Sequence, residues 1–397
     1  MSDALVIAIV ATGIAALIIG AVTWMLVLPA RAARLQRRVL PEHDPPLEFV
    51  ERLLELSESL PERSAQDHPT LDSDALLRER GALLEQGRVE AARRVAQVLC
   101  VLTDPSPEIE AQARTPPSPP AELRAVEPDR WISQLASPAL ERPLTAIMAL
   151  LGPEVITWHA HPADRFGLTQ ERRAEYLSVP PPIALLAPQV AQAVSVSPPV
   201  LFVTPEREGR LIHINLAVAG RYHAALAVGR QALAIDDDAT QRFMLGRKLT
   251  YMRPEHLLCT EVDGPDDLLA LHRAVAAVLS PGTLEEPPEV VCGIPVDEAL
   301  ARLRERFSTA ELAALMRQVL TAAGPEVGLE RWARWLVAAE ETSFRCGLLM
   351  SGDLQAAMTI LHLEDVKPGT DREREQCYNA LYGFYVSEPY EALRQSL

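Results

Sequence analysis

Residues 4–28 form the longest run of apolar side chains in the chain, and they contain no Asp, Glu, Lys or Arg. At about 1.5 Å per residue, a helix over this run is about 37 Å long, which exceeds the hydrocarbon core of a bilayer at about 30 Å. Met1, Ser2 and Asp3 lack the basic residues that begin a secretory signal peptide, and Pro29 ends the helical pattern. The run therefore predicts one transmembrane helix over residues 4–28.

The next part of the chain alternates between broken and regular helical patterns. Prolines interrupt residues 29–72, which we interpret as a juxtamembrane connector with one amphipathic piece over residues 47–60. Residues 73–103 have helical spacing on both sides of Gly87, and this predicts a helical hairpin that packs on the main domain. The apolar positions are Leu76, Leu77, Leu83, Leu84, Val89, Ala92, Val95, Ala96 and Leu99. The segment LLEQGRVEAARRVAQVL resembles a single tetratricopeptide repeat.

A proline-rich stretch at residues 104–128 marks a domain boundary. Its composition favours extended backbone with little packing, so we predict a linker here. Residues 129–397 then form the largest unit. Its first part, ISQLASPALERPLTAIMALLG, and residues 183–196 have the apolar spacing of helices.

The period then changes to that of β-strands. The runs PVLFVTP, RLIHINLAV and YHAALAVG are short and rich in β-branched or alternating apolar residues, with a turn at Glu208 and Gly209 between the first two. Helical patterns return with DDDATQRFMLGRKLTYMRPEH and continue over residues 266–279, 296–306, 309–323, 329–351, 354–363 and 371–384. The predicted fold class is α+β, mostly helical, with one small sheet.

Charge limits the partners of this chain. The net charge is −16, from 38 basic and 54 acidic residues, which would repel nucleic-acid phosphates and excludes nucleic acid as a partner. The five cysteines are widely scattered and form no CxxC pair. We therefore expect free thiols and no zinc knuckle.

The charges next to the predicted anchor set its orientation. The only charged side chain before it is Asp3, whereas four arginines follow it, namely Arg31, Arg34, Arg37 and Arg38. The positive-inside rule then predicts an inner-membrane protein with a short N-terminus outside and a cytoplasmic C-terminal domain. Trp24 is placed to lie at the membrane interface. Small residues at intervals of four could let two anchors pack closely as a homodimer, and these are Ala8, Thr12, Ala16 and Gly20.

The strand-like runs followed by FMLGRKLTY resemble the HtpX-like and CAAX-prenyl-protease family of zinc metallopeptidases. In that family a small sheet precedes a helix with the motif His-Glu-x-x-His, whose histidines bind zinc and whose glutamate activates water. The first histidine falls on Arg247, the glutamate on Lys248 and the second histidine on Tyr251. The segment WLVAAEETSFRCGLLMSGDLQAAMTIL resembles the family's second helix. The third zinc ligand falls on Glu340 in this segment, and Phe344 replaces an aspartate.

These departures from the family motif remove its chemistry. The cationic side chains of Arg247 and Lys248 would repel zinc and could not act as a general base at neutral pH. The resemblance therefore implies an inactive peptidase-like domain with no metal cofactor and no catalytic residue. A half-buried carboxylate without a partner is costly, so we expect Glu340 to pair with Arg247 or Lys248.

We interpret the chain as a membrane-anchored cytoplasmic protein that contacts the lipid bilayer through residues 4–28 and acts through an unidentified protein partner. Two alternatives stay open. One is a zinc-dependent or unorthodox membrane-associated hydrolase with its site around Glu340. The other is a helical membrane-anchored scaffold that is unrelated to the peptidase family.

Three weaker candidates have structural explanations. His159 and His161 could be a metal pair, but no third ligand of suitable spacing is evident, and a pair in a loop or at a strand edge explains them better. Residues 236–238 are three aspartates that could bind a cation, and capping of the following helix explains them. His256 could be a displaced zinc ligand or a histidine at the end of a helix.

Overall fold

The structure is a computed structural model, and it describes residues 47–59, 71–115, 123–280, 288–324, 327–363 and 371–397. The predicted transmembrane helix, its stripe of small residues and the arginines after it lie outside the described residues. Within the described ranges, no helix has the length and apolar character needed to cross a bilayer. The described chain is mostly helical with one small three-stranded sheet, as the sequence predicted.

The three alternating runs form the sheet, with strands β1 (Val200–Thr204), β2 (Leu211–Val218) and β3 (Arg221–Gly229). The strand order is β1-β3-β2, with β1 parallel and β2 antiparallel to β3. Although β1 and β2 are consecutive in the sequence, their connection passes over the end of β3 and they do not pair. This passage requires glycine, because a Cβ at Gly229 would lie 1.9 Å from the carbonyl oxygen of Gly209.

The long connection before β1 lies along both edges of the sheet. The His161 N–H donates to the Asn215 carbonyl at 3.0 Å on the β2 edge, and Arg173 pairs with Phe202 on the β1 edge. Short helical turns make up this connection and others near the sheet. They are η2 (Ile156–His159), η3 (Ala163–Phe166), η4 (Gln170–Arg172), η5 (Ala174–Tyr176), α9 (Arg230–Leu233) and η6 (Leu257–Thr260).

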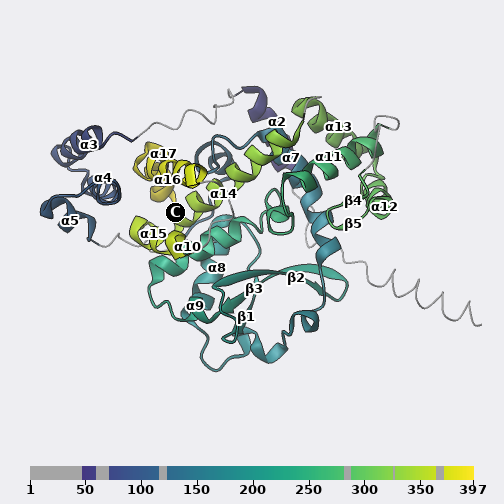
Figure 1. The fold of residues 1–397 in the computed structure, drawn as a ribbon, viewed down its shortest axis with the longest axis horizontal. Helices are drawn as coiled ribbons and strands as arrows, with labels where there is room; N and C mark the ends of the chain where they lie inside the picture. The colour runs from purple at the N-terminus through teal and green to yellow at the C-terminus, as the bar shows by residue number, and fades with distance from the viewer. Residues whose placement is uncertain (1–46, 60–70, 116–122, 281–287, 325–326, 364–370) are drawn as a thin grey trace, which may run out of the picture.

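Helices α10 (Asp238–Thr250) and α14 (Leu329–Ser351) cross at the centre of the molecule (Figure 1). They meet at two glycines. A Cβ at Gly246 would lie 2.9 Å from the Cα of Gly347, and a Cβ at Gly347 would lie 2.8 Å from the carbonyl oxygen of Phe243. The missing side chains let the two backbones touch, so residues on either side of the crossing face each other.

The apolar stretch after the predicted boundary is divided into separate elements instead of forming one helix. It begins with α6 (Pro128–Arg130) and the π-helical turn η1 (Trp131–Leu135), and it continues in α7 (Arg142–Val155). Pro138 lies in the break and Pro143 in the first turn of α7, because proline lacks the N–H that a helix interior needs. Helix α8 (Pro182–Val194) follows and packs on α10.

A second group of helices flanks α14 near its N-terminal end: α11 (Pro265–Leu279), α12 (Val296–Arg306) and α13 (Ala310–Ala323). Between α11 and α12 lies a hairpin of β4 (Val290–Val291) and β5 (Ile294–Pro295). The sequence analysis missed this hairpin because two-residue strands have no detectable period. The chain ends in α15 (Leu354–Leu363), α16 (Asp371–Val386) and α17 (Glu388–Ser396), of which α17 was not predicted.

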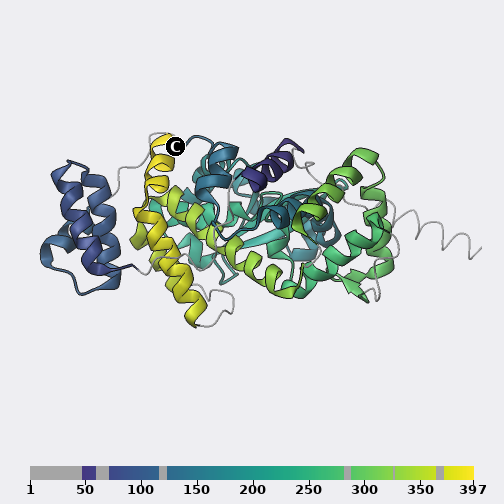
Figure 2. The same cartoon turned by 90° about the horizontal axis from the view of Figure 1, so that it is seen from above.

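The predicted helical hairpin is present at one end of the elongated molecule, beside α16 and α17 (Figure 2). It consists of α3 (Ser73–Glu85) and α4 (Val89–Leu102), and α2 (Leu47–Ser59) packs separately on α7. Part of the predicted linker is helical, which corrects that prediction: α5 (Pro107–Ala113) packs on α4. Its proline occupies the first turn, where no N–H is needed, and Ile109 is buried.

Candidate functional site

The crossing of α10 and α14 brings together residues that the sequence analysis had singled out. Arg247 follows Gly246 on α10, and Glu340 lies about two turns before Gly347 on α14. Arg247 is buried, and its Nη2 donates a hydrogen bond to Glu340 Oε1 at 3.1 Å. The expected pairing of Glu340 with a cation from α10 is therefore present.

Phe344 and Tyr251 complete this cluster. The guanidinium carbon of Arg247 lies 4.4 Å from the centre of the Phe344 ring, which is a favourable cation–π contact. The Tyr251 hydroxyl donates to Ser343 Oγ at 3.2 Å. Burial, and to a smaller extent the negative charge of Glu340, raise the pKa of Tyr251, so its hydroxyl stays protonated.

Lys248 contributes to a lowered pKa at a histidine of the sheet. The ring centre of His213, on β2, lies 6.0 Å from that of Tyr251 in an edge-on arrangement. Burial, followed by the positive charge of Lys248, lowers the pKa of His213 to about 3. His213 is therefore neutral at physiological pH. The sequence analysis missed His213 because the alternating pattern of a strand does not show whether a histidine in it has a special role.

The cluster holds an ion pair and a hydroxyl pair but no recognisable metal site. Among the residues that the structure describes, no three of His, Cys, Asp or Glu gather in a way that could hold a metal ion. His161 Nδ1 lies 2.9 Å from Arg165 Nη1, whereas His159 Nδ1 lies 3.8 Å from Glu261 Oε2, so the two histidines have different partners.

The three aspartates before α10 include the cap of that helix. The side chain of Asp237 accepts a hydrogen bond from the Thr240 N–H at 2.7 Å, as expected for an N-cap residue. This bond starts α10 at a defined residue. Capping therefore accounts for Asp237, as the sequence analysis expected.

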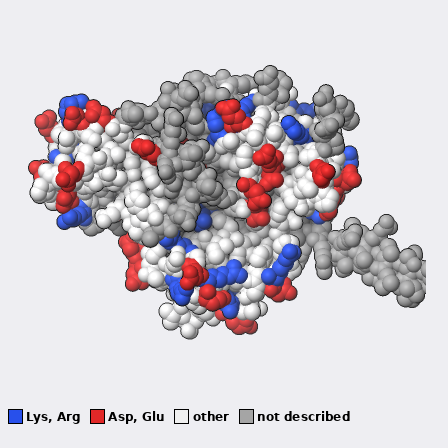
Figure 3. Space-filling view, in the orientation of Figure 1, with Lys and Arg blue, Asp and Glu red and all other residues white. Residues whose placement is uncertain are grey.

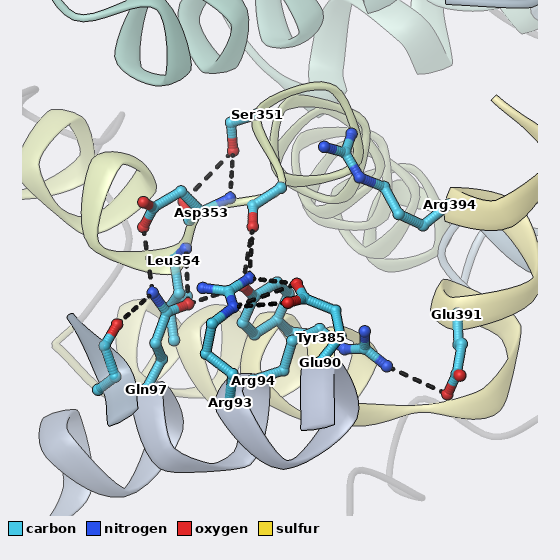
Figure 4. Close-up of polar contacts among 12 residues, drawn as sticks. Glu90, Arg93, Arg94, Gln97, Ser351, Asp353, Leu354, Tyr385, Glu391 and Arg394 are labelled. Carbon is cyan, nitrogen blue, oxygen red and sulfur yellow. Dashed lines mark hydrogen bonds and ion pairs between the residues drawn. The ribbon is translucent and has the colours of Figure 1, made fainter. Parts of the chain in front are cut away.

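A second buried polar cluster joins the hairpin to the C-terminal helices (Figure 4). Arg93 on α4 is 2% exposed. Its Nη2 donates to Glu90 Oε1 at 2.6 Å and lies 3.3 Å from the Gly352 carbonyl oxygen and 3.4 Å from the Tyr385 hydroxyl. The Tyr385 hydroxyl lies 2.7 Å from Gln97 Oε1, which it can reach as a donor. This network holds the hairpin in one orientation, since leaving such buried groups unpaired would be costly.

An ion pair at the other side of α4 strengthens the same junction. Arg94 Nη2 donates to Glu391 Oε2 on α17 at 3.2 Å, and its guanidinium carbon lies 5.3 Å from the centre of the Tyr390 ring. Arg88 also pairs with Glu391. Contacts from two faces of α4 therefore attach the hairpin to α16 and α17.

The exposed surface has mixed charge, and the hairpin adds apolar positions to it. On the face shown in Figure 3, acidic and basic side chains lie among one another. The hairpin exposes four large aliphatic side chains, which are Leu77, Leu84, Val89 and Val101. Two of these residues lie on α3 and two on α4, so both helices of the hairpin expose aliphatic side chains.

Comparisons with models of protein families, with curated proteins and with solved structures find no match to this chain.

Proposed function

We propose that this protein is a membrane-anchored, peptidase-like protein without peptidase chemistry, which acts by binding another protein at the cytoplasmic face of the membrane. The observation that carries the proposal is the ion pair between Arg247 and Glu340 at the crossing of α10 and α14. The resemblance to zinc metallopeptidases aligns these residues with two metal ligands. The guanidinium engages the carboxylate that a metal would need.

Arg247 also fills the space between the two helices. Its Cγ lies 2.8 Å from the position that a Cβ of Gly347 would take, and its charged end stacks on Phe344. A divalent cation would have to displace a buried guanidinium in order to bind here. The alternative hydrolase with a site around Glu340 would first have to release this carboxylate from Arg247.

The hairpin is the element that we expect to meet the partner. Its polar cluster with α16 and α17 holds it in place, so its exposed aliphatic residues are presented on a rigid surface. Preorganisation of this kind lowers the entropic cost of association. Val89 is the most exposed of these residues, at 62%.

Crosslinking in the native membrane tests the binding proposal. A photoreactive amino acid replaces Val89 in the full chain, and a matched control replaces Leu185 on α8, which is 63% exposed but lies outside the hairpin. We expect a discrete crosslinked protein from position 89 and none from position 185, and Leu84→Asp should reduce its yield. Equal labelling from both positions would contradict a specific partner at the hairpin.

Restoring the metal motif tests the resemblance itself. The triple variant Arg247→His, Lys248→Glu and Tyr251→His keeps Glu340 as the third ligand. We expect the folded triple variant to bind about one zinc per chain, and the unaltered chain to bind none in stoichiometric amount. Metal analysis by mass spectrometry measures both.

Adding Glu340→Gln to the triple variant is the control, and it should remove the zinc because a neutral amide is a poor zinc ligand. A folded triple variant without zinc would support an unrelated helical scaffold. Stoichiometric zinc in the unaltered chain, lost with Glu340→Gln alone, would instead support the hydrolase alternative.

A further inference from the structure

A cavity of about 880 Å³ lies beside the C-terminal end of α10, where several separate segments meet. Its described walls come from α2, from the start of α6, from the residues after α8, from β3 and from residues 252–257. Most of this lining is apolar and includes Phe49, Val126, Tyr222 and Met252. The volume lies within the range of about 300 to 1,000 Å³ that is usual for small-molecule sites.

Among the charged side chains in the wall, that of Arg253 is almost fully buried, at 7% exposure. Its guanidinium carbon lies 3.9 Å from the centre of the Trp131 ring and 5.4 Å from that of Phe49. Its Nε donates to Glu255 Oε1 at 2.6 Å, and its Nη1 donates to the Val194 carbonyl at 2.9 Å. These contacts hold the guanidinium plane in place and engage two of its three nitrogens.

The third guanidinium nitrogen of Arg253, Nη2, makes no hydrogen bond to the described residues. The hydrogen bonds of this side chain to described residues all come from Nε and Nη1. Nη2 is accessible, because it is absent from the fully buried atoms that have no partner. Arg253 lines the cavity, and Nη2 is the nitrogen that its other contacts leave available to a ligand there. The cavity therefore combines a mostly apolar wall with a buried, preorganised hydrogen-bond donor.

The charges around the cavity favour a neutral ligand. Glu255, which is 1% exposed, already balances Arg253, and at the rim Arg52 pairs with Asp129 and Glu55. A ligand carboxylate would bring an uncompensated negative charge into this mostly apolar wall, which is costly. A carbonyl oxygen can accept the Arg253 hydrogen bond without that cost.

We infer that this cavity binds a neutral acyl ester or amide, with its carbonyl oxygen at Arg253 Nη2 and its hydrocarbon chain along the apolar wall. Each methylene of the chain that is buried against this wall strengthens binding, because apolar surface is removed from water. The lining contains none of the former zinc-motif positions, so the inference is independent of the proposed function.

Calorimetry on the full chain, held in an amphipathic polymer so that no detergent competes, tests the inference. The probes are decanamide, methyl decanoate and decanoate. We expect the amide and the ester to bind with similar Kd, and decanoate to bind at least tenfold more weakly. Tighter binding of decanoate, or binding of none of the three probes, would overturn the assignment.

Two variants place the ligand in this cavity. Ala224→Phe puts a ring into the cavity wall on β3 and should weaken decanamide binding at least tenfold. Arg253→Lys keeps a cation beside Glu255 but removes the guanidinium group and with it the Nη2 donors. This variant should bind decanamide about tenfold more weakly. Ala314→Phe, at an exposed position of α13, is the matched control and should leave Kd unchanged. Unchanged binding by a folded Ala224→Phe protein would exclude the cavity as the site.

Discussion

Replacing Gly347 with alanine is expected to lower the free energy of unfolding by about 2 to 4 kcal/mol, because overpacking against backbone cannot relax easily. The added Cβ would lie 2.8 Å from the Phe243 carbonyl oxygen and 2.8 Å from Arg247 Cγ. Both are closer than real Cβ contacts, so α10 and α14 would have to separate. Urea unfolding followed by tryptophan fluorescence measures the loss.

Gly383→Ala is the control for this substitution. Gly383 lies within α16, where a Cβ would meet no atom within 4 Å. Alanine is the better helix former by about 1 kcal/mol, so this variant should be as stable as the unaltered chain or slightly more stable. Equal effects of the two substitutions would show that the crossing of α10 and α14 does not depend on its glycines.

A second large effect is expected from pH, through His256. This side chain is fully buried, and neither ring nitrogen has a hydrogen-bond partner among the described residues. Burial lowers the pKa of His256 from 6.5 to about 4; the charge of Glu255 raises it by a smaller amount, and the charge of Arg253 lowers it further. Its ring stacks on Trp335, with 6.2 Å between ring centres. The folded protein therefore holds this imidazole in its neutral form.

The direction of the pH effect follows from the two pKa values. Between pH 6.5 and 4 the unfolded chain binds a proton at His256 that the folded chain does not bind. The free energy of unfolding is therefore highest above pH 6.5, as far as His256 contributes to it. It decreases as the pH falls from 6.5 towards 4. At pH 4.5 the loss from this one group should be about 2 to 3 kcal/mol.

His256→Phe isolates this contribution, because it keeps a ring beside Trp335 and removes the titrating group. The loss of stability between pH 7 and pH 4.5, measured by urea unfolding, should be smaller by about 2 kcal/mol in this variant. Burial also lowers the pKa values of His213 and His272, to about 3 and about 4, so a residual acid sensitivity should persist. An unchanged pH dependence in the variant would mean that His256 is protonated in the folded protein.

The glycine crossing and the ion pair of Arg247 depend on each other. The aliphatic part of Arg247 occupies the space beside Gly347, and its guanidinium reaches both Glu340 and Phe344. A larger residue at position 347 would therefore disturb the ion pair as well as the packing. The packing of the two helices and the ion pair therefore rest on the same side chain, Arg247.

Local patterns in the sequence were enough to predict most helices and the three strands of the sheet. The apolar spacing of residues 329–351 and 354–363 predicted α14 and α15 with the bounds that the structure has. The pairing of Glu340 with Arg247 or Lys248 was expected from the resemblance to zinc peptidases, and the structure has Arg247 beside this carboxylate. The helices and strands depend only on residues near in sequence.

Other features depended on which surfaces of distant segments meet. The strand order β1-β3-β2, the contact of Gly246 with Gly347, and the cavity at Arg253 join residues from separate parts of the chain. The burial of His256 and the attachment of Arg93 to Gly352 and Tyr385 are of the same kind. The sequence by itself therefore determined the elements and their charges. The tertiary structure decided the crossings, cavities and pKa shifts, because packing and desolvation arise only when segments far apart in the chain exclude water together.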